Sequence, residues 1–436
     1  MPSASETARR MLKALLTTGT VDGVADRQKR SMATPSWPWL RQTKSLNPSF
    51  TASYWRALTG HGPASQADQA VLYDDVAQAD LAVYGRNIEN YVGNLRVPVG
   101  AIGPLRINGL FAQGDHYVPL ATTEAALVAS YGRGARLISA AGGCAAAILA
   151  EGVHRAPGFA FADLADAGRF VLWVMNAEDR LRAAAEATTR HGKLVDIAPH
   201  IEGDHVYLVC TYTTGDAAGQ NMVTIATQAL CEAIAAECPV KPLYWFLETN
   251  LSGDKKASAL SFTAVRGRKA VAEIILPADL VESTLHTTTR RMHDYWRMSA
   301  LGGVMSGSIG IQGHYANGLA ALYLATGQDV ACVAESAVGV TRFELREDDA
   351  LYASVTLPNI IVGTVGGGTG LPTQSAGLSI LGLKGEGKAR ALAEVCAALC
   401  LAGELSIIGA LAAGHFARAH ASLARRAPDA AGDAPA

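Results

Sequence analysis

Apolar and polar positions alternate along the chain in a way that predicts a helical opening followed by mixed strands and helices. Residues 1–88 are typical of helices and include an amphipathic segment at Gln66–Tyr84. Short apolar strings broken by Gly and Pro between Glu89 and Pro119 predict strands and turns. A helix is expected from Thr122 through Ala135 and beyond, and the small residues of Ser139–Ala150 would allow it to lie centrally and buried. The later predictions are a strand at Ser258–Pro277 and helices over Leu280–Ala300, near His314–Thr326 and over Ala389–Arg426.

The stretch from Gly158 to Thr249 has a separate pattern. A short apolar string precedes a helical segment at Asp163–Arg190, two strand-like runs follow, and a helix at Met222–Glu237 precedes a strand at Leu243–Thr249. This βαββαβ order is the ferredoxin-like arrangement. The predicted fold class is therefore α/β (α+β), with a ferredoxin-like domain inserted into a large mixed domain, and it is not a Rossmann fold.

The length of 436 residues allows two or three domains. We expect an N-terminal helical region at 1–88 and a large domain formed by 89–155 and 257–426. The inserted domain is expected at 156–246, a connecting loop at 247–256, and a disordered tail at 427–436.

Composition and charge exclude several classes of protein. With 49% apolar and 17% charged residues the chain is globular, and a net charge of −2 provides no basic excess for nucleic acid or an anionic membrane. The seven cysteines have no zinc or redox spacing, so we expect no metal and a reducing, cytoplasmic location. The uncharged segment Ser354–Leu383 contains Pro358 and Pro372, which prevent a continuous membrane-spanning helix.

Four polar or glycine-rich stretches are candidates for chemistry, and each has an ordinary structural explanation as well. Glu124 could be a helix-dipole partner, and Thr213–Met222 could be a plain strand-to-helix connection. Asp254-Lys255-Lys256 could be solvated surface, or a loop folded over a carboxylate or an oxyanion. Gly363–Gly370 permits close approach of a phosphate-bearing ligand but lacks the dinucleotide fingerprint.

Seven strings in the chain resemble, in the same order and at similar spacings, the motifs of the hydroxymethylglutaryl-CoA reductase family. They are ENYVGNLRVPVGAIGPL (89–105), PLATTEAALVAS (119–130), TTGDAAGQNM (213–222), DKK (254–256), ATGQD (325–329), GTVGGGT (363–369) and GALAAGHFARAH (409–420). The resemblance extends from about Glu89 to Arg425, and the DKK loop is similar to the class I branch without its membrane region.

The resemblance implies reduction of a thioester to an alcohol with two NADPH and release of CoA. It assigns Glu124 as proton donor, Lys255 as oxyanion stabiliser and Asp329 as a carboxylate coupled to both. His420 resembles the histidine that protonates the departing thiolate, a step suited to a group with a pKa near neutrality. The inserted domain becomes the NADP-binding domain, 247–256 the catalytic loop, and the large domain the substrate and CoA site.

The same resemblance assigns the binding residues. The residues implied for the cofactor are Asp216, Gly219, Asn221, Met222, Gly366, Gly367 and Gly368, with Thr189, Arg190 and Lys193 at the 2′-phosphate. Those implied for the substrate are Arg155, Asn250, Asp254, Lys256, His314 and Asn317, with Glu89, Asn90, Arg133, Arg136 and His286 on the CoA side. The family also implies a homodimer or a dimer of dimers with shared active sites.

Three departures from the family pattern concern the substrate. Glu248 stands where a serine is expected, and Met298 and His286 stand where lysines are expected. Hydroxymethylglutaryl-CoA, reduced to mevalonate, is the leading substrate. The alternatives are a paralogous reductase of another acyl-CoA or acyl-thioester, and a catalytically silent CoA- or nucleotide-binding protein.

Overall fold

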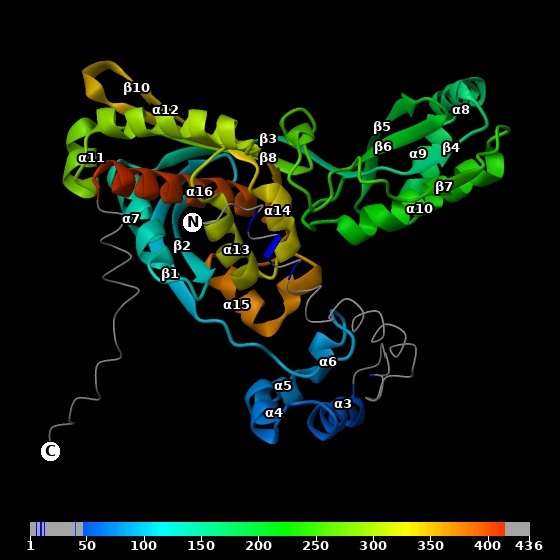
Figure 1. The fold of residues 1–436 in the computed structure, drawn as a ribbon, viewed down its shortest axis with the longest axis horizontal. Coiled ribbons are helices and arrows are strands. Elements are labelled where there is room, and N and C mark those ends of the chain that lie inside the picture. The colour runs from blue at the N-terminus through cyan, green and yellow to red at the C-terminus, as the bar shows by residue number, and fades with distance from the viewer. Residues whose placement is uncertain (1–5, 7–8, 11–12, 14–39, 41–46, 415–436) are drawn as a thin grey trace. The chain divides into compact units, whose positions relative to one another are not determined.

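The structure is a computed structural model that describes Glu6, Arg9, Arg10, Lys13, Leu40 and residues 47–414. Two compact units divide the chain, Met1–Arg96 and Val97–Ala436. The first contains α3 (Pro48–Gly60), α4 (Gln66–Leu72), α5 (Asp75–Ala79) and α6 (Leu81–Tyr84) (Figure 1). Asn47 caps α3, and the buried Trp55 donates its indole N–H to the carbonyl of Val92 at 2.9 Å.

A mixed sheet forms the centre of the second unit. Its large part has the order β3 (Cys144–Arg155), β8 (Gly267–Leu276), β11 (Leu351–Ile360), β10 (Gly339–Leu345) and β9 (Gly310–Ile311). The hairpin of β1 (Val99–Gly109) and β2 (Gln113–Ala121) joins through a parallel pairing of β1 with β3. β3 pairs antiparallel with β8, as β8 does with β11 and β11 with β10.

Helix α16 (Ala389–Ala412) is the core helix of this part and contacts β8, β11, β3 and β1 (Figure 1). Other helices around it are α7 (Leu127–Ala140), α11 (Ala278–Leu285), α12 (Thr289–Ser306) and α13 (Tyr315–Thr326); α14 (Val333–Ser336) contacts α13 and β11, and α15 (Pro372–Ile380) contacts α13 and β2. Within the described residues, α16 is the one helix long and apolar enough to span a membrane, and 89% of its apolar window is buried inside the protein. Its composition therefore reflects core packing.

The ferredoxin-like part has its own apolar core. It consists of β4 (Gly158–Ala160), α8 (Leu164–Asn176), α9 (Glu178–Glu186), β5 (Lys193–Glu202), β6 (His205–Thr213), α10 (Gln220–Glu237) and β7 (Tyr244–Phe246). The strand order is β7-β4-β6-β5 and every neighbouring pair is antiparallel. The predicted fold class is confirmed.

Several predicted elements differ from the observed ones. Cys144–Arg155 is strand β3 and not a continuation of the helix that ends at Ala140, because Gly142 and Gly143 take left-handed φ values of 95° and 102°. The helix predicted over Leu280–Ala300 is two helices, since His286 is left-handed and ends α11. The last helix ends at Ala412, and the predicted extension to Arg426 lies mostly outside the described residues.

Candidate active site

Lys255 and Asp329 form a partly exposed ion pair. Lys255 lies in the loop after β7, and Asp329 follows α13 and caps the short 3-10 helix Val330–Cys332 (η2). The Lys255 ammonium lies 2.9 Å from Asp329 Oδ2, and both side chains are 42% exposed. The hydrogen bond to Asp329 raises the pKa of Lys255 above its ordinary value. Lys255 is therefore a cation at neutral pH, placed where it can stabilise an oxyanion.

Glu124 and Asn317 form a second polar pair. Glu124 lies in the connection between β2 and α7, outside the helix expected there, because Ala126 has a left-handed φ of 70° and α7 begins at Leu127. Asn317 in the first turn of α13 donates its Nδ2 hydrogen to Glu124 Oε2 at 2.8 Å. The structure thus joins the predicted proton donor to Asn317, which was expected among the substrate-binding residues.

His314, just before α13, is fixed by the buried Glu404 of α16. Glu404 accepts the N–H groups of Gly313 at 2.8 Å and His314 at 3.0 Å, and the Thr341 hydroxyl at 2.8 Å. The His314 ring stacks on Tyr131 with centroids 5.0 Å apart. A buried carboxylate with this many donors holds the turn that begins α13, and with it the position of Asn317.

The two polar pairs lie at opposite ends of α13. Asn317 is in its first turn and Asp329 follows its last, and a helix of 12 residues is about 18 Å long. Between residues 47 and 414, neither Glu124 nor Asn317 forms a hydrogen bond or ion pair with Lys255 or Asp329. The three expected catalytic residues that the structure describes therefore form two separate groups in a single subunit, Glu124 in one and Lys255 with Asp329 in the other.

The loop between β6 and α10 is held by Asp216. Its carboxylate accepts the N–H groups of Gly387 at 2.7 Å and Ala389 at 3.1 Å, at the start of α16. Partial burial by itself raises the pKa of Asp216, but these N–H donors outweigh it and the pKa is lowered. Asp216 therefore shapes the loop, whereas Gly219, left-handed at φ 80°, begins α10 without a side-chain cap. Asn221 and Met222 lie in that uncapped first turn.

The glycine cluster Gly366–Gly368 lies against the ATGQD turn. A Cβ on Gly327 would lie 2.4 Å from the carbonyl oxygen of Gly368, so the two backbones touch. Gln328 also links the ATGQD turn to the start of the GTVGGGT string. Its side chain accepts the N–H of Gly363 at 2.8 Å and donates to the Gly363 carbonyl at 3.0 Å. Gly366 and Gly367 are exposed and left-handed, with no atom within 4 Å of an added Cβ. They leave open space next to the backbone of this loop.

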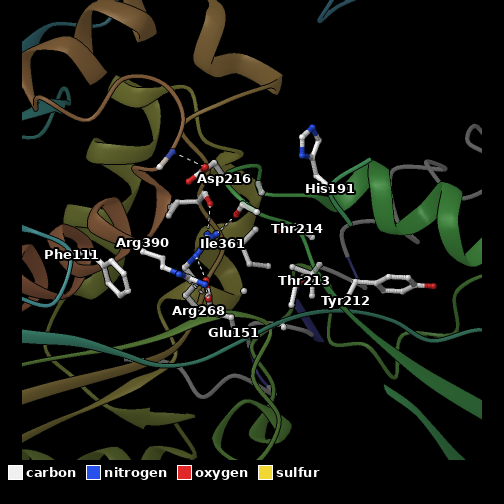
Figure 2. A pocket seen from close by; sticks show the side chains of 17 residues that line it. Phe111, Glu151, His191, Tyr212, Thr213, Thr214, Asp216, Arg268, Ile361 and Arg390 are labelled. Atoms are coloured by element: carbon white, nitrogen blue, oxygen red, sulfur yellow. Dashed lines mark hydrogen bonds and ion pairs between the residues drawn. The ribbon is translucent and has the colours of Figure 1, made fainter. Parts of the chain in front are cut away.

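A cavity of about 410 Å³ contains the Asp216 loop (Figure 2). Arg268 lines this cavity and donates to the carbonyls of Gly215 at 2.5 Å and Val362 at 2.8 Å. Glu151 binds both Arg268 and Arg390, each at 2.8 Å, and the Arg390 guanidinium lies 5.2 Å from the centre of the Phe111 ring. Sequence reasoning missed Phe111, Glu151, His191, Arg268 and Arg390. Their only sequence signal is an arginine beside Gly267 and a histidine between Arg190 and Lys193, because their partners are remote in the chain.

The residues expected at the 2′-phosphate are near one another but differ in the contacts that each already makes. Thr189 Oγ1 accepts the N–H groups of His191 at 3.3 Å and Gly192 at 3.1 Å and donates to Met222 Sδ, so it closes its own turn. The Lys193 ammonium is paired with Glu186 at 2.7 Å. Arg190 is exposed at this turn. Of the two cations, Lys193 is already neutralised locally.

Arg155 is a buried arginine bound by two partly buried carboxylates. It is only 6% exposed, and its Nη1 donates to Asp254 at 2.9 Å and to Glu248 at 3.3 Å. Glu248 also accepts the N–H of Asn250 at 2.7 Å, while the Lys256 ammonium donates to the Asp254 carbonyl at 2.9 Å. The structure brings four of the expected substrate residues together, namely Arg155, Asn250, Asp254 and Lys256, but Arg155 is already paired with two carboxylates.

Two adjoining cavities lie along the start of α7. One of about 440 Å³ includes Glu124, and one of about 710 Å³ includes Arg133, Arg136 and His286. Both are lined by Val128 and Ala129, so the two cavities adjoin along α7. Arg133 is anchored, because its Nη2 donates to the Ser406 carbonyl at 2.9 Å.

Three expected residues fall elsewhere. Glu89 and Asn90 belong to the N-terminal unit, where Asn90 Oδ1 accepts the Tyr54 hydroxyl at 3.0 Å. His420 lies outside the described residues.

Comparison with known proteins identifies the family. A family model described as hydroxymethylglutaryl-coenzyme A reductase matches residues 63–425. The 3-hydroxy-3-methylglutaryl-coenzyme A reductase of Haloferax volcanii is 46% identical over 344 residues, covering 78% of this chain and 85% of that protein. That of Aeropyrum pernix is 43% identical over 378 residues, covering 85% of this chain and 88% of that protein.

Solved structures agree at the level of the fold. The class II 3-hydroxy-3-methylglutaryl-CoA reductase from Streptococcus pneumoniae, solved with NADPH in open conformations, superposes with a TM-score of 0.60 at 21% identity. The match covers 79% of this chain and 84% of that chain. The polar pairs, the glycine loops and the family match agree, and this chain belongs to the hydroxymethylglutaryl-coenzyme A reductase family.

Proposed function

We propose that the protein reduces 3-hydroxy-3-methylglutaryl-CoA to mevalonate and free CoA, with two NADPH as reductant. The observation that carries this proposal is the Lys255–Asp329 ion pair in a member of this family. Reduction of a thioester carbonyl develops negative charge on oxygen, and a fixed ammonium beside that oxygen stabilises it. Asp329 keeps Lys255 protonated for this role, since their hydrogen bond raises the pKa of the lysine.

Two other residues would donate the protons that the reaction needs. Glu124, held by Asn317 at 2.8 Å, supplies a proton to the carbonyl oxygen. His420 protonates the departing CoA thiolate, a task that suits an imidazole near neutral pH. The cavity that includes Arg133, Arg136 and His286 would take the anionic CoA portion.

The chain fits a phosphate-bearing dinucleotide. α10 begins at the left-handed Gly219 with no side-chain cap, so its first N–H groups can bind a phosphate. The cavity of about 410 Å³ beside it leads from the Asp216 loop to His191 next to Arg190. Bound NADPH would supply the hydride at this site. We assign residues 156–246 as its domain and the Thr189, Arg190 and Lys193 turn as its 2′-phosphate contact.

The catalytic set would be completed between two subunits. Glu124 with Asn317 and Lys255 with Asp329 lie at opposite ends of α13, a helix about 18 Å long. Two copies that place one pair against the other complete two identical sites, as a symmetric dimer requires. Mixing an inactive Glu124→Gln chain with an inactive Lys255→Ala chain tests this, because a shared site restores part of the activity. Mixtures that stay inactive although mixed dimers form would contradict shared sites.

A reductase of another acyl thioester is the second candidate, and Glu248 favours it. Its carboxylate lies 3.3 Å from Arg155, which is the residue expected to bind the free carboxylate of the substrate. Met298 on α12 is 76% exposed and adds no positive charge. NADPH oxidation measured with a panel of acyl-CoA thioesters, with and without a terminal carboxylate, separates the candidates. No turnover of any thioester would indicate a silent binding protein.

A further inference from the structure

Lys255 is held at both ends by carboxylates of one short segment. Asp329 binds its ammonium at 2.9 Å, and Glu335 Oε1 accepts its backbone N–H at 3.1 Å. These two acids begin and nearly end the segment made of η2 and α14. The same short segment therefore holds both the side chain and the backbone of Lys255.

The backbone of Lys255 needs such support. Its φ of 56° lies in the left-handed region, which residues with a Cβ seldom adopt and which persists where surrounding contacts impose it. Gly253 is also left-handed, at 72°, and provides a turn just before it. The bond from the Lys255 N–H to Glu335 fixes the point at which the lysine side chain leaves this turn.

Glu335 is itself anchored by a buried arginine. It is wholly buried, and both of its oxygens lie 2.5 Å from Arg266 Nη1. Arg266 is 2% exposed and also donates to Asp254, the residue before Lys255, at 2.7 Å. Removal of two charges from water is costly, and this pair is retained next to the one lysine that the expected chemistry needs.

We propose that Glu335 is a positioning residue that, through the Lys255 N–H and Arg266, sets the lysine ammonium against Asp329. This inference rests on the proposed function where it treats Lys255 as a catalytic residue. The contact between Lys255 and Asp329 can be measured without turnover. The charged and titratable groups that face Lys255 are Asp329, Cys332 and Asp254, and Glu335 reaches only its backbone. Loss of Glu335 would therefore act on Lys255 by moving it.

Competitive acetylation of the full chain gives the activity-independent test. Trace acetic anhydride reacts with unprotonated amines, and peptide mass spectrometry compares Lys255 with Lys241, which is exposed in the ferredoxin-like part. In Glu335→Gln one of the two oxygens that Arg266 binds becomes an NH2 donor, so the support of the Lys255 turn weakens and the Lys255–Asp329 contact loosens. The Lys255/Lys241 labelling ratio should then rise about threefold or more, equal to about half a pKa unit. Glu394→Gln is the matched control, because Glu394 is also wholly buried and accepts two backbone N–H groups, those of Phe111 and Ala112. Its ratio should not change.

Kinetics provide the second measurement. Glu335→Gln should lower kcat by about tenfold to a hundredfold, the scale of a misplaced catalytic group, while KM for the thioester changes less than about threefold. If Glu335→Gln does not fold, the double variant Arg266→Met with Glu335→Met removes both buried charges and also deletes the acceptor, which glutamine keeps as an amide oxygen. A folded variant of either kind with an unchanged labelling ratio and an unchanged kcat would overturn the proposal. A wild-type protein inactive on every thioester would instead count against the proposed function, with the labelling result unaffected.

Discussion

Asp216 and Gly387 are joined by a hydrogen bond of 2.7 Å across 171 residues of sequence. The bond fastens the loop before α10 to the start of α16, so both sides of the candidate cofactor cavity depend on one carboxylate. Because the folded-state pKa of Asp216 is lowered, its stabilising contribution is present above the ordinary value of 3.8 and is lost as the pH falls through the folded pKa.

We expect Asp216→Asn to lower the free energy of unfolding at pH 7 by about 1 kcal/mol, a discounted value for a partly exposed charged hydrogen bond. The deficit should shrink as the pH approaches the acid range. Urea denaturation at several pH values measures it, with the exposed Glu386→Gln as control. An equal loss of unfolding free energy at every pH would show that the charge of Asp216 does not contribute to stability.

Glu404→Gln should disturb the beginning of α13. The amide can serve fewer of the N–H donors of Gly313 and His314, and a buried donor left unpaired costs about 1–3 kcal/mol. We expect a lower melting temperature and a kcat reduced about tenfold, because Asn317 no longer holds Glu124. Thr341→Val, which removes only one hydroxyl from Glu404, should have a smaller effect on kcat. Equal kcat values in both variants would contradict this role.

Arg190→Ala should raise KM for NADPH far more than KM for NADH. A charge-assisted contact to the 2′-phosphate contributes about 1.5–3 kcal/mol, or roughly tenfold or more in affinity. Lys193→Ala should do less, because Glu186 already neutralises Lys193 at 2.7 Å. Steady-state kinetics with both nucleotides decide the matter. Equal effects on the two nucleotides would place the phosphate contact elsewhere.

Glu248→Ser should favour substrates with a free carboxylate. The change leaves Arg155 with one acidic partner instead of two, so KM for hydroxymethylglutaryl-CoA should fall about tenfold, while acyl-CoA esters without a carboxylate should change little. Glu248→Gln is the matched variant that keeps the size. If the carboxylate-free esters improved equally, competition for Arg155 would not be the cause.

His420→Gln should slow thioester reduction by about 10²–10⁴-fold, the usual contribution of a general acid. Reduction of the free aldehyde should be spared, because it releases no thiolate. His415→Gln is the control on the same stretch of sequence. Loss of thioester activity in His415→Gln alone would reverse the assignment.

Local pattern predicted much of the fold. The helix near His314–Thr326 is confirmed as α13, and the βαββαβ order is confirmed, with β6 as the strand whose buried positions alternate most regularly. The failure at Ser139–Ala150 has a physical reason. Alanines favour a helix locally, but Cys144–Arg155 becomes a strand through its pairings with β1, β8 and β6, which no local pattern contains.

The candidate site was predictable where residue type and order suffice. Asn317 with Glu124 and Lys255 with Asp329 were expected residues, and both pairs are in contact. The supports behind them were not predictable. Glu335 meets Arg266 across 69 residues, and Glu404 meets His314 across 90, so their roles exist only after folding.

β3 passes through both sheets, which makes its length a shared property of two domains. Residues up to Gly152 pair with β8, and Val153–Arg155 pair with β6. Because side chains alternate between faces, deleting one residue before Gly152 would either reverse the large-domain face or shift Arg155 out of register in the small one. Natural variation in length is therefore expected in the turns on either side of this strand, and the strand itself sets a fixed spacing between the large sheet and the ferredoxin-like sheet.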